Sequence, residues 1–273
     1  TAAKMAAGVI GHSTAMVADA SHSASDIIAS LVVLFSLKVA KKPPDEEHPY
    51  GHGKAESLAT TLVGVFLLMA GLLIAYSAIK SIITSNVVKP GLLPLLAAIL
   101  SIVVKESMFQ YTYRIGEKIQ SPSTVANAWH HRSDAYSSIA SLIGIFGARY
   151  GILVLDPIAG IAVTVFIIKM GWDITSDGIH QLMDGFSNRQ IIEGVKQIIN
   201  DCEGVLELRA IKARQSGPYI FFDISIGVDR KMTFEESHQV AANVKSKIKS
   251  KYDKVNDVLI HVDPVEKQNE LSS

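Results

Sequence analysis

Long apolar segments that are almost free of charge are the feature that most constrains how this chain can fold. Residues 57–79 contain no charged side chain, and about 20 apolar residues suffice for a helix to cross a bilayer. Four more segments of similar length are predominantly apolar, at 13–37, 92–113, 126–147 and 152–170. The sequence therefore predicts five membrane-spanning helices. The first residues look like the tail of a helix already under way, so we expect a sixth helix upstream of residue 1.

Charged residues are distributed unevenly along the chain, which predicts two domains. They are sparse up to residue 172 and frequent from residue 184 onward, so we expect a membrane domain at 1–183 and a water-exposed domain at 184–273. Lysines and arginines concentrate between the first and second spans and between the third and fourth. The positive-inside rule places these connections, and with them the C-terminal domain, in the cytoplasm.

The composition excludes two classes of protein. The 26 Lys and Arg residues balance the 26 Asp and Glu residues, and no long basic tract occurs, so we expect no nucleic-acid partner. Cys202 is the single cysteine. Neither a disulfide framework nor a thiolate metal cluster can therefore form within the chain.

Two of the predicted spans carry a histidine followed four residues later by an aspartate. His22 and Asp26 lie in the first span, and His130 and Asp134 lie in the fourth. Residues i and i+4 share one face of a helix, so each span presents one imidazole and one carboxylate in the same direction. If the two faces meet, the four side chains suit a tetrahedral Zn²⁺ ion, whose charge the two aspartates neutralise. An alternative is a hydrogen-bonded pair within each helix that only stabilises the bundle.

Other ionisable residues in the spans have simpler interpretations. Asp19 lies three residues before His22 on a similar face of the helix and is interpreted as a packing or helix-start residue, with a fifth polar contact at the site as the alternative. Lys105 and Glu106 lie near a predicted cytoplasmic helix end, where snorkelling or mutual pairing accounts for them.

The connection between the first two spans contains a second cluster of metal-binding residue types. Asp45, His48 and His52 lie in a segment rich in Pro and Gly, which stops the helix and allows tight turns. A folded loop can bring the three side chains onto one ion, which predicts a weaker and more exposed site. An alternative is a polar loop that contains two histidines by chance.

The C-terminal domain has an alternating pattern of elements. A helix is predicted at 189–200, strands at 205–214 and 219–228, a helix from Thr233 and a strand at 258–262. Thr233 and Glu236 have the spacing of a capping box. The candidate metal ligands in this domain are His238, His261, Asp263 and Asp223, and an alternative is that they are ordinary surface residues.

The combination of these motifs resembles the cation diffusion facilitator family of metal/proton antiporters. The resemblance lies in the stretches 18–26, 48–56, 129–134, 156–160, 214–217 and 260–264. It implies a six-helix transmembrane bundle, of which residues 1–12 form the outer end of the first helix and the following turn. It also implies a cytoplasmic αββαβ domain that resembles a metallochaperone, and a homodimer in the membrane lipid, as in a bacterial cytoplasmic membrane.

The resemblance also assigns residues. It implies that His22, Asp26, His130 and Asp134 form the transport site and that Asp45, His48 and His52 form the loop site. Lys54 and Asp184 correspond to an ion pair at the membrane edge of the dimer. Family members often have another histidine on the second strand of the cytoplasmic domain, where this chain has Ser225, so we expect an altered or weaker cytoplasmic site that includes Asp223.

The predicted function is proton-coupled efflux of a divalent transition metal, with Zn²⁺ as the expected cargo and regulator and protons as the counter-ion. Imidazole ligands favour zinc over harder ions. Alternatives are export of Mn²⁺, Fe²⁺, Cd²⁺ or Co²⁺ by the same fold, a membrane metal sensor without transport, or a membrane-embedded metallohydrolase. We expect a secondary transporter and not an enzyme, with neither catalytic nor cofactor-binding residues.

Overall fold

Helices make up the first two thirds of the chain, and a small α/β domain follows them. The structure is a computed structural model that describes residues 1–85 and 87–266, except for the side chains at 33, 122, 123, 126 and 130. The first part consists of α1 (Ala2–Ile10), α2 (Thr14–Ala40), α3 (Lys54–Ile83), α4 (Leu92–Lys118), α5 (Pro122–Arg149) and α6 (Leu155–Leu182).

Four of these helices, α2, α3, α4 and α6, are long and apolar enough to cross a membrane. They correspond to four of the five predicted spans. The remaining predicted span, 126–147, lies within α5, which has 28 residues. Polar residues such as Arg132 and Asp134 in its first half lower its hydropathy, so its length fits a membrane helix better than its composition does.

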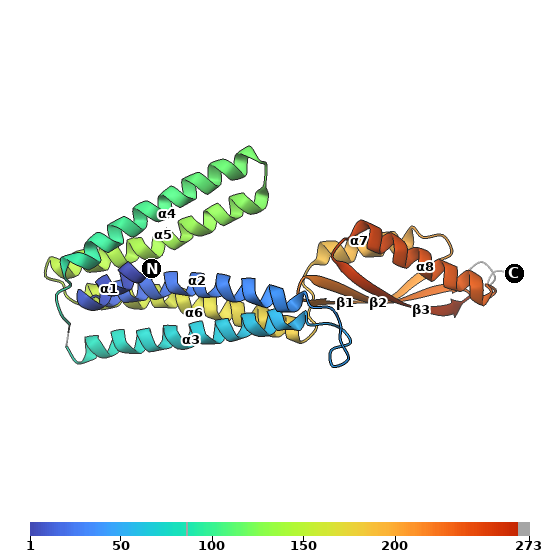
Figure 1. The fold of residues 1–273 in the computed structure, drawn as a ribbon, viewed down its shortest axis with the longest axis horizontal. Helices are drawn as coiled ribbons and strands as arrows, with labels where there is room; N and C mark the ends of the chain where they lie inside the picture. The colour runs from blue at the N-terminus through green and yellow to red at the C-terminus, as the bar shows by residue number, and fades with distance from the viewer. Residues whose placement is uncertain (86, 267–273) are drawn as a thin grey trace. The chain divides into compact units, whose positions relative to one another are not determined.

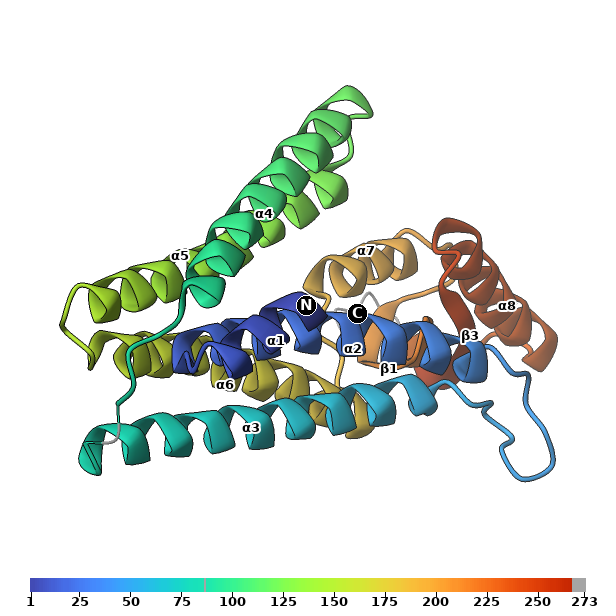
Figure 2. The ribbon, with the colours of Figure 1, turned by 60° about the vertical axis from the view of Figure 1, so that its left-hand side comes forward.

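The chain separates into two compact units that divide the long helices. The first unit comprises Thr1–Val32 and Leu62–Thr175, and the second comprises Val33–Thr61 and the residues from Ser176 onward. Within the first unit, α4 and α5 run side by side and diverge from the other helices toward the turn that joins them (Figures 1 and 2).

Small residues allow α3 and α6 to approach closely. A Cβ atom added at Gly64 would lie 2.3 Å from the Thr175 hydroxyl oxygen and 2.9 Å from the Gly171 carbonyl oxygen. Such close contacts between helix backbones are typical of membrane bundles, where apolar side chains gain little by turning away from lipid.

The C-terminal domain consists of α7 (Arg189–Asn200), β1 (Glu207–Ser216), β2 (Tyr219–Asp229), α8 (Phe234–Lys251) and β3 (Val255–Val265). The predicted order of elements is confirmed, and β3 is longer than expected. The sheet has the order β1-β2-β3, with β1 antiparallel and β3 parallel to β2. The predicted capping box is present at the start of α8, where Thr233 and Glu236 bond each other's backbone amides.

The core of this domain lies between the sheet and its two helices, which cover one face (Figure 1). Alternate residues of β2, including Phe222 and Ile226, are buried against α7 and α8. Cys202 belongs to the same core and is 4% exposed. The residues between them on β2 face away from the helices, and these positions carry the polar side chains discussed below.

Candidate metal sites

The structure brings together three of the four side chains predicted for the transport site. His22 and Asp26 lie one turn apart on α2, and Asp134 lies on α5. One ligand atom from each residue lies within 4.8 Å of the others. His22 Nε2 is 3.5 Å from Asp134 Oδ1, and these side chains are 8% and 13% exposed. His130 lies on α5 one turn before Asp134, but its side chain is outside those that the structure describes.

The electrostatics of this cluster favour a cation. Two carboxylates converge where little water reaches them, so their mutual repulsion is poorly screened. The His22 Nδ1 atom is buried and has no hydrogen-bond partner among the described residues. Two carboxylate oxygens and a ring nitrogen are a donor set that suits a divalent transition metal.

A buried ionic network contacts this cluster through the backbone of Asp134. Its contacts differ from the predictions made for Asp19 and Lys105. Asp19 is fully buried and pairs with Lys4 Nζ at 2.5 Å. Lys105 Nζ donates to the Asp134 carbonyl oxygen at 2.6 Å and to Ser138 Oγ at 3.1 Å. Lys105 therefore points into the bundle and does not snorkel, and Asp19 is an ion-pair partner and not a packing residue. The sequence does not reveal this network, because Lys4, Asp19 and Lys105 come from three helices and no local spacing connects them.

The loop between α2 and α3 gathers the second predicted cluster. The ligand atoms of Asp45, His48 and His52 lie within 4.8 Å of one another. His48 Nδ1 is 3.1 Å from Asp45 Oδ1, and His52 Nε2 is 3.4 Å from Asp45 Oδ2. A hydrogen bond from the His48 amide is the main cause that lowers the pKa of Asp45. The carboxylate is therefore ionised and ready to bind a cation.

An aromatic contact attaches the same loop to the sheet of the C-terminal domain. The Arg214 guanidinium lies 5.2 Å from the ring centre of Tyr50 and 5.4 Å from that of Phe221. Each is a cation–π distance. Lys54, which begins α3, forms an ion pair with Asp184 at 2.9 Å within the chain. The two residues of the predicted ion pair are therefore brought together.

The candidate ligands of the cytoplasmic domain divide between the two faces of the sheet. His261 Nε2 is 3.2 Å from Asp263 Oδ1 on the face away from the helices. Asp223 is exposed on the same face of β2, where Ser225 pairs with His261 across the strands. His238 lies on α8 and stacks on Phe234. It lines a pocket with Ile260 and Val262, which alternate with His261 on β3, so the four residues do not form one group within this chain.

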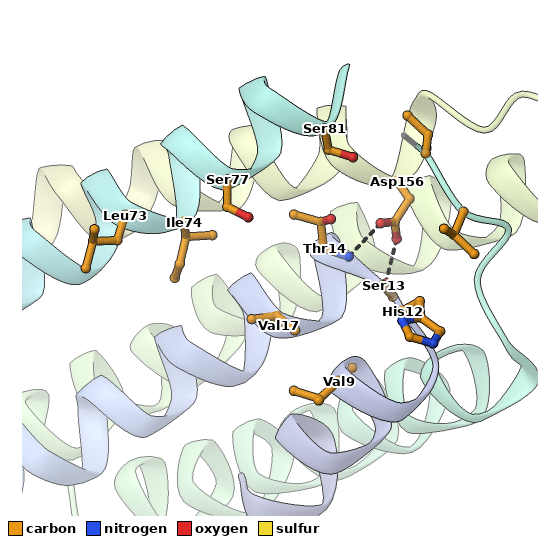
Figure 3. A pocket seen from close by; sticks show the side chains of 13 residues that line it. Val9, His12, Ser13, Thr14, Val17, Leu73, Ile74, Ser77, Ser81 and Asp156 are labelled. Carbon is orange, nitrogen blue, oxygen red and sulfur yellow. Dashed lines mark hydrogen bonds between the residues drawn. The ribbon is translucent and has the colours of Figure 1, made fainter. Parts of the chain in front are cut away.

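A cavity of about 450 Å³ lies where α2 and α6 begin (Figure 3). Its polar wall includes Asp156, which accepts hydrogen bonds from Ser13 Oγ at 2.5 Å and from the Thr14 amide at 2.7 Å. The carboxylate from α6 therefore caps the start of α2, where free amide groups favour a negative charge. This contact explains structurally why an aspartate occurs at the start of the last span.

Comparison with known proteins identifies the class. Residues 1–183 match the cation efflux transmembrane domain, and residues 188–265 match the cation efflux protein, cytoplasmic domain. The chain belongs to the cation efflux, or cation diffusion facilitator, family. It is therefore an integral membrane transporter for the efflux of divalent metal cations, with its C-terminal domain in the cytoplasm, and the metallohydrolase alternative is wrong.

Individual relatives cover nearly the whole chain. The chain is 38% identical to the magnetosome protein MamB of Magnetospira sp. strain QH-2 over 258 residues, which are 94% of this chain and 88% of that protein. It is 34% identical to the manganese efflux system protein MneP of Bacillus subtilis strain 168 over 270 residues, with coverage of 96% and 91%. It is 32% identical to the manganese efflux system protein MneS of the same strain over 268 residues, with coverage of 98% and 92%.

Proposed function

We propose that the protein exports a divalent transition metal in exchange for protons, and that His22, Asp26, His130 and Asp134 hold the ion in transit. The observation that carries this proposal is the convergence of His22, Asp26 and Asp134 from two membrane helices onto a space that one ion can fill. Buried carboxylates are costly in a membrane unless a cation or a proton neutralises them. This requirement couples occupancy by metal to occupancy by protons.

We propose Mn²⁺ as the leading cargo, in place of the zinc expected from the sequence. Two relatives that align with more than nine tenths of this chain are named manganese efflux system proteins. The placed ligands include two carboxylates and one imidazole, and carboxylate oxygens suit Mn²⁺. Zn²⁺ is the second candidate, because a set completed by His130 would contain two imidazoles, which favour zinc.

The exchange follows from the chemistry of the ligands. A metal binds only deprotonated ligands, so the cytoplasm-facing site captures the ion with both aspartates ionised and both histidines neutral. Protons that enter from the other side of the membrane compete for the same nitrogen and oxygen atoms. Protonation releases the ion, and the carrier returns without metal.

The remaining predicted sites fit a regulatory role in a homodimer. The family match at 188–265 supports dimerisation through the cytoplasmic domain. We infer that the loop ligands Asp45, His48 and His52 and the pair His261 and Asp263 sense the cytoplasmic metal. We also infer that the Lys54–Asp184 ion pair lies at the membrane edge of the dimer, close to the proposed domain boundary at residues 183 and 184.

Transport by purified protein in liposomes tests the proposal. Asp134→Ala should reduce Mn²⁺ uptake to the level of protein-free liposomes, because the site loses one of its two negative charges, while dimers remain intact on size-exclusion chromatography. Asp173→Ala removes an exposed carboxylate from α6 and should transport normally. Uptake by Asp134→Ala at the wild-type rate would refute the transport site, and uptake of Zn²⁺ with exclusion of Mn²⁺ would reverse the assigned cargo.

A further inference from the structure

We propose that Lys105 is a fixed counter-cation of the transport site, which weakens metal binding so that the carrier can release its cargo. The inference rests on the proposed function, since it assumes that Asp26 and Asp134 hold the ion. It concerns a residue that is not among the predicted metal ligands.

The position of Lys105 links the ionic network to the transport site. Its side chain extends from α4, is 15% exposed, and contacts the backbone of the ligand Asp134 on α5. Its ammonium group lies 3.8 Å from Asp19 Oδ1. Asp134 also supplies one of the carboxylates of the transport site. The ammonium group therefore contacts a ligand-bearing residue and is close enough to act on an ion held there.

Asp19 does not need Lys105 for its own neutralisation. Lys4 already forms an ion pair with Asp19 at 2.5 Å. Ser137 and Ser138 donate hydrogen bonds to the same carboxylate, each at 3.0 Å. A buried carboxylate with one close ammonium group and two hydroxyl donors is well satisfied. The second lysine adds a surplus positive charge, and its ammonium group lies 2.6 Å from the backbone carbonyl oxygen of the proposed ligand Asp134.

Counting charges shows what this surplus does. With carboxylates ionised and imidazoles neutral, Asp19, Asp26 and Asp134 carry three negative charges, and Lys4 and Lys105 carry two positive charges. The empty cluster then has a net charge of −1, and a divalent metal changes it to +1. Without Lys105 the corresponding charges are −2 and 0.

The difference matters in a medium of low polarity, where the cost of a charged cluster rises steeply with its net charge. Without Lys105 the loaded state is neutral and the empty state is the costly one, so metal binding is strongly favoured and release is slow. With Lys105 the two states carry charges of equal size. Loaded and empty carriers then have similar energies, as a transporter that must bind on one side and return empty requires.

The competing explanation is that Lys105 only ties α4 to α5 at Asp134. The two explanations predict opposite changes in affinity. Loss of a structural tie loosens the site and weakens metal binding. Loss of a counter-cation strengthens binding and slows turnover, so that KM and kcat both fall.

The experiment measures Mn²⁺ binding to the full chain in detergent by titration calorimetry, and Mn²⁺ uptake in liposomes. All variants carry Asp45→Ala and Asp263→Ala, which remove the loop site and the cytoplasmic pair from the binding signal. Lys105→Met keeps the length of the side chain but removes its charge. It should lower the Kd and the KM for Mn²⁺ at least about tenfold and should also lower kcat. The effect is large because charges a few ångströms apart interact strongly even at an intermediate dielectric. Lys105→Arg should stay close to the parent.

A second variant tests the same idea in the opposite direction. Asp19→Asn removes a negative charge at almost constant size, so it should raise the Kd about tenfold or more. Lys80→Met changes an exposed lysine at the end of α3 and serves as the matched control. The proposal is overturned if Lys105→Met binds Mn²⁺ as weakly as the parent or more weakly. If Lys105→Met does not fold, the proposal is overturned when Asp19→Asn binds Mn²⁺ as tightly as the parent.

Failure of the inference can be told apart from failure of the proposed function. Asp134→Ala should abolish the binding signal in the same titration. If that variant still binds Mn²⁺, the transport site itself is misassigned. If it loses binding while Lys105→Met does not bind more tightly, the transport site stands and only the role of Lys105 is wrong.

Discussion

Ser225 lies at the candidate metal site of the cytoplasmic domain. It lies beside His261 on the neighbouring strand, and its hydroxyl donates a hydrogen bond of 2.6 Å to Asp263 Oδ2. This hydrogen bond is the main cause that lowers the pKa of Asp263. The carboxylate is therefore ionised, but one of its oxygens is occupied by a hydroxyl, which is a poor metal ligand compared with an imidazole.

Replacing this serine should strengthen the cytoplasmic site. Ser225→His places an imidazole next to His261 and Asp263 and supplies a third strong ligand. We expect metal binding to the cytoplasmic domain to tighten at least about tenfold, since one additional good ligand is worth more than about 1.4 kcal/mol. Titration with Mn²⁺ of the full chain that carries Asp134→Ala and Asp45→Ala isolates this site. Ser225→Ala in the same background is the control. Equal affinities for Ser225→His and Ser225→Ala would show that this face of the sheet does not bind metal.

At the level of elements, a salt bridge between α8 and β3 fastens the second helix of the cytoplasmic domain to the edge of its sheet. Lys245 Nζ lies 2.6 Å from Asp257 Oδ1, and the two side chains are 43% and 53% exposed. The hydrogen bond from Lys245 is the main cause that lowers the pKa of Asp257. The pKa of Asp257 is therefore lower in the folded protein than in the unfolded chain. The ion pair stabilises the fold fully at pH values above the unfolded-state pKa, and this stabilisation is lost as the pH falls through the folded-state pKa.

Asp257→Asn should therefore destabilise the docking of α8 at neutral pH and have no effect in acid. The loss should be below about 1 kcal/mol, because the pair is half exposed and water screens it. Hydrogen exchange of the α8 amides, followed from neutral pH down to about pH 3, measures the difference between the variant and the parent. Asp253→Asn, which changes another exposed carboxylate nearby, is the control. A difference that does not shrink as the pH falls below the unfolded-state pKa of the carboxylate would contradict the assigned cause.

At the level of the whole molecule, the order of elements and the candidate site on α2 and α5 are largely readable from the sequence, because they follow local rules. Apolar length predicts α2, α3, α4 and α6, and the i, i+4 spacing of His22 and Asp26 predicts a shared helix face that does meet Asp134. The network of Lys4, Asp19 and Lys105 could not be predicted. Its contacts depend on how three helices are rotated about their axes, and spacing within one helix says nothing about that rotation.

The identity of the transported ion is the second property that the sequence alone does not predict. Donor softness pointed to zinc, whereas two extensive relatives are named for manganese efflux. A ligand set that mixes carboxylates and imidazoles can serve either ion. Its residue types alone therefore do not decide between them.

The proposed exchange for protons concerns the complete transporter and can be tested there. Liposomes with an acidic lumen should accumulate Mn²⁺ through the protein, and the lumen should become more alkaline as they do so, because each ion that enters displaces protons from shared ligands. A pH-sensitive dye inside the liposomes and radioactive Mn²⁺ outside follow both movements. A protonophore should abolish the accumulation. Uptake against a gradient that survives the protonophore would exclude protons as the counter-ion.

The burial of Cys202 in the core between the sheet and its helices has a practical consequence. Since residues 1–273 contain no second cysteine, a water-soluble maleimide has no accessible thiol among them while the cytoplasmic domain is folded. Fluorophores or spin labels can be attached to newly introduced cysteines against a silent background, without first replacing a natural residue. Any label found on Cys202 itself would report that the cytoplasmic domain has opened.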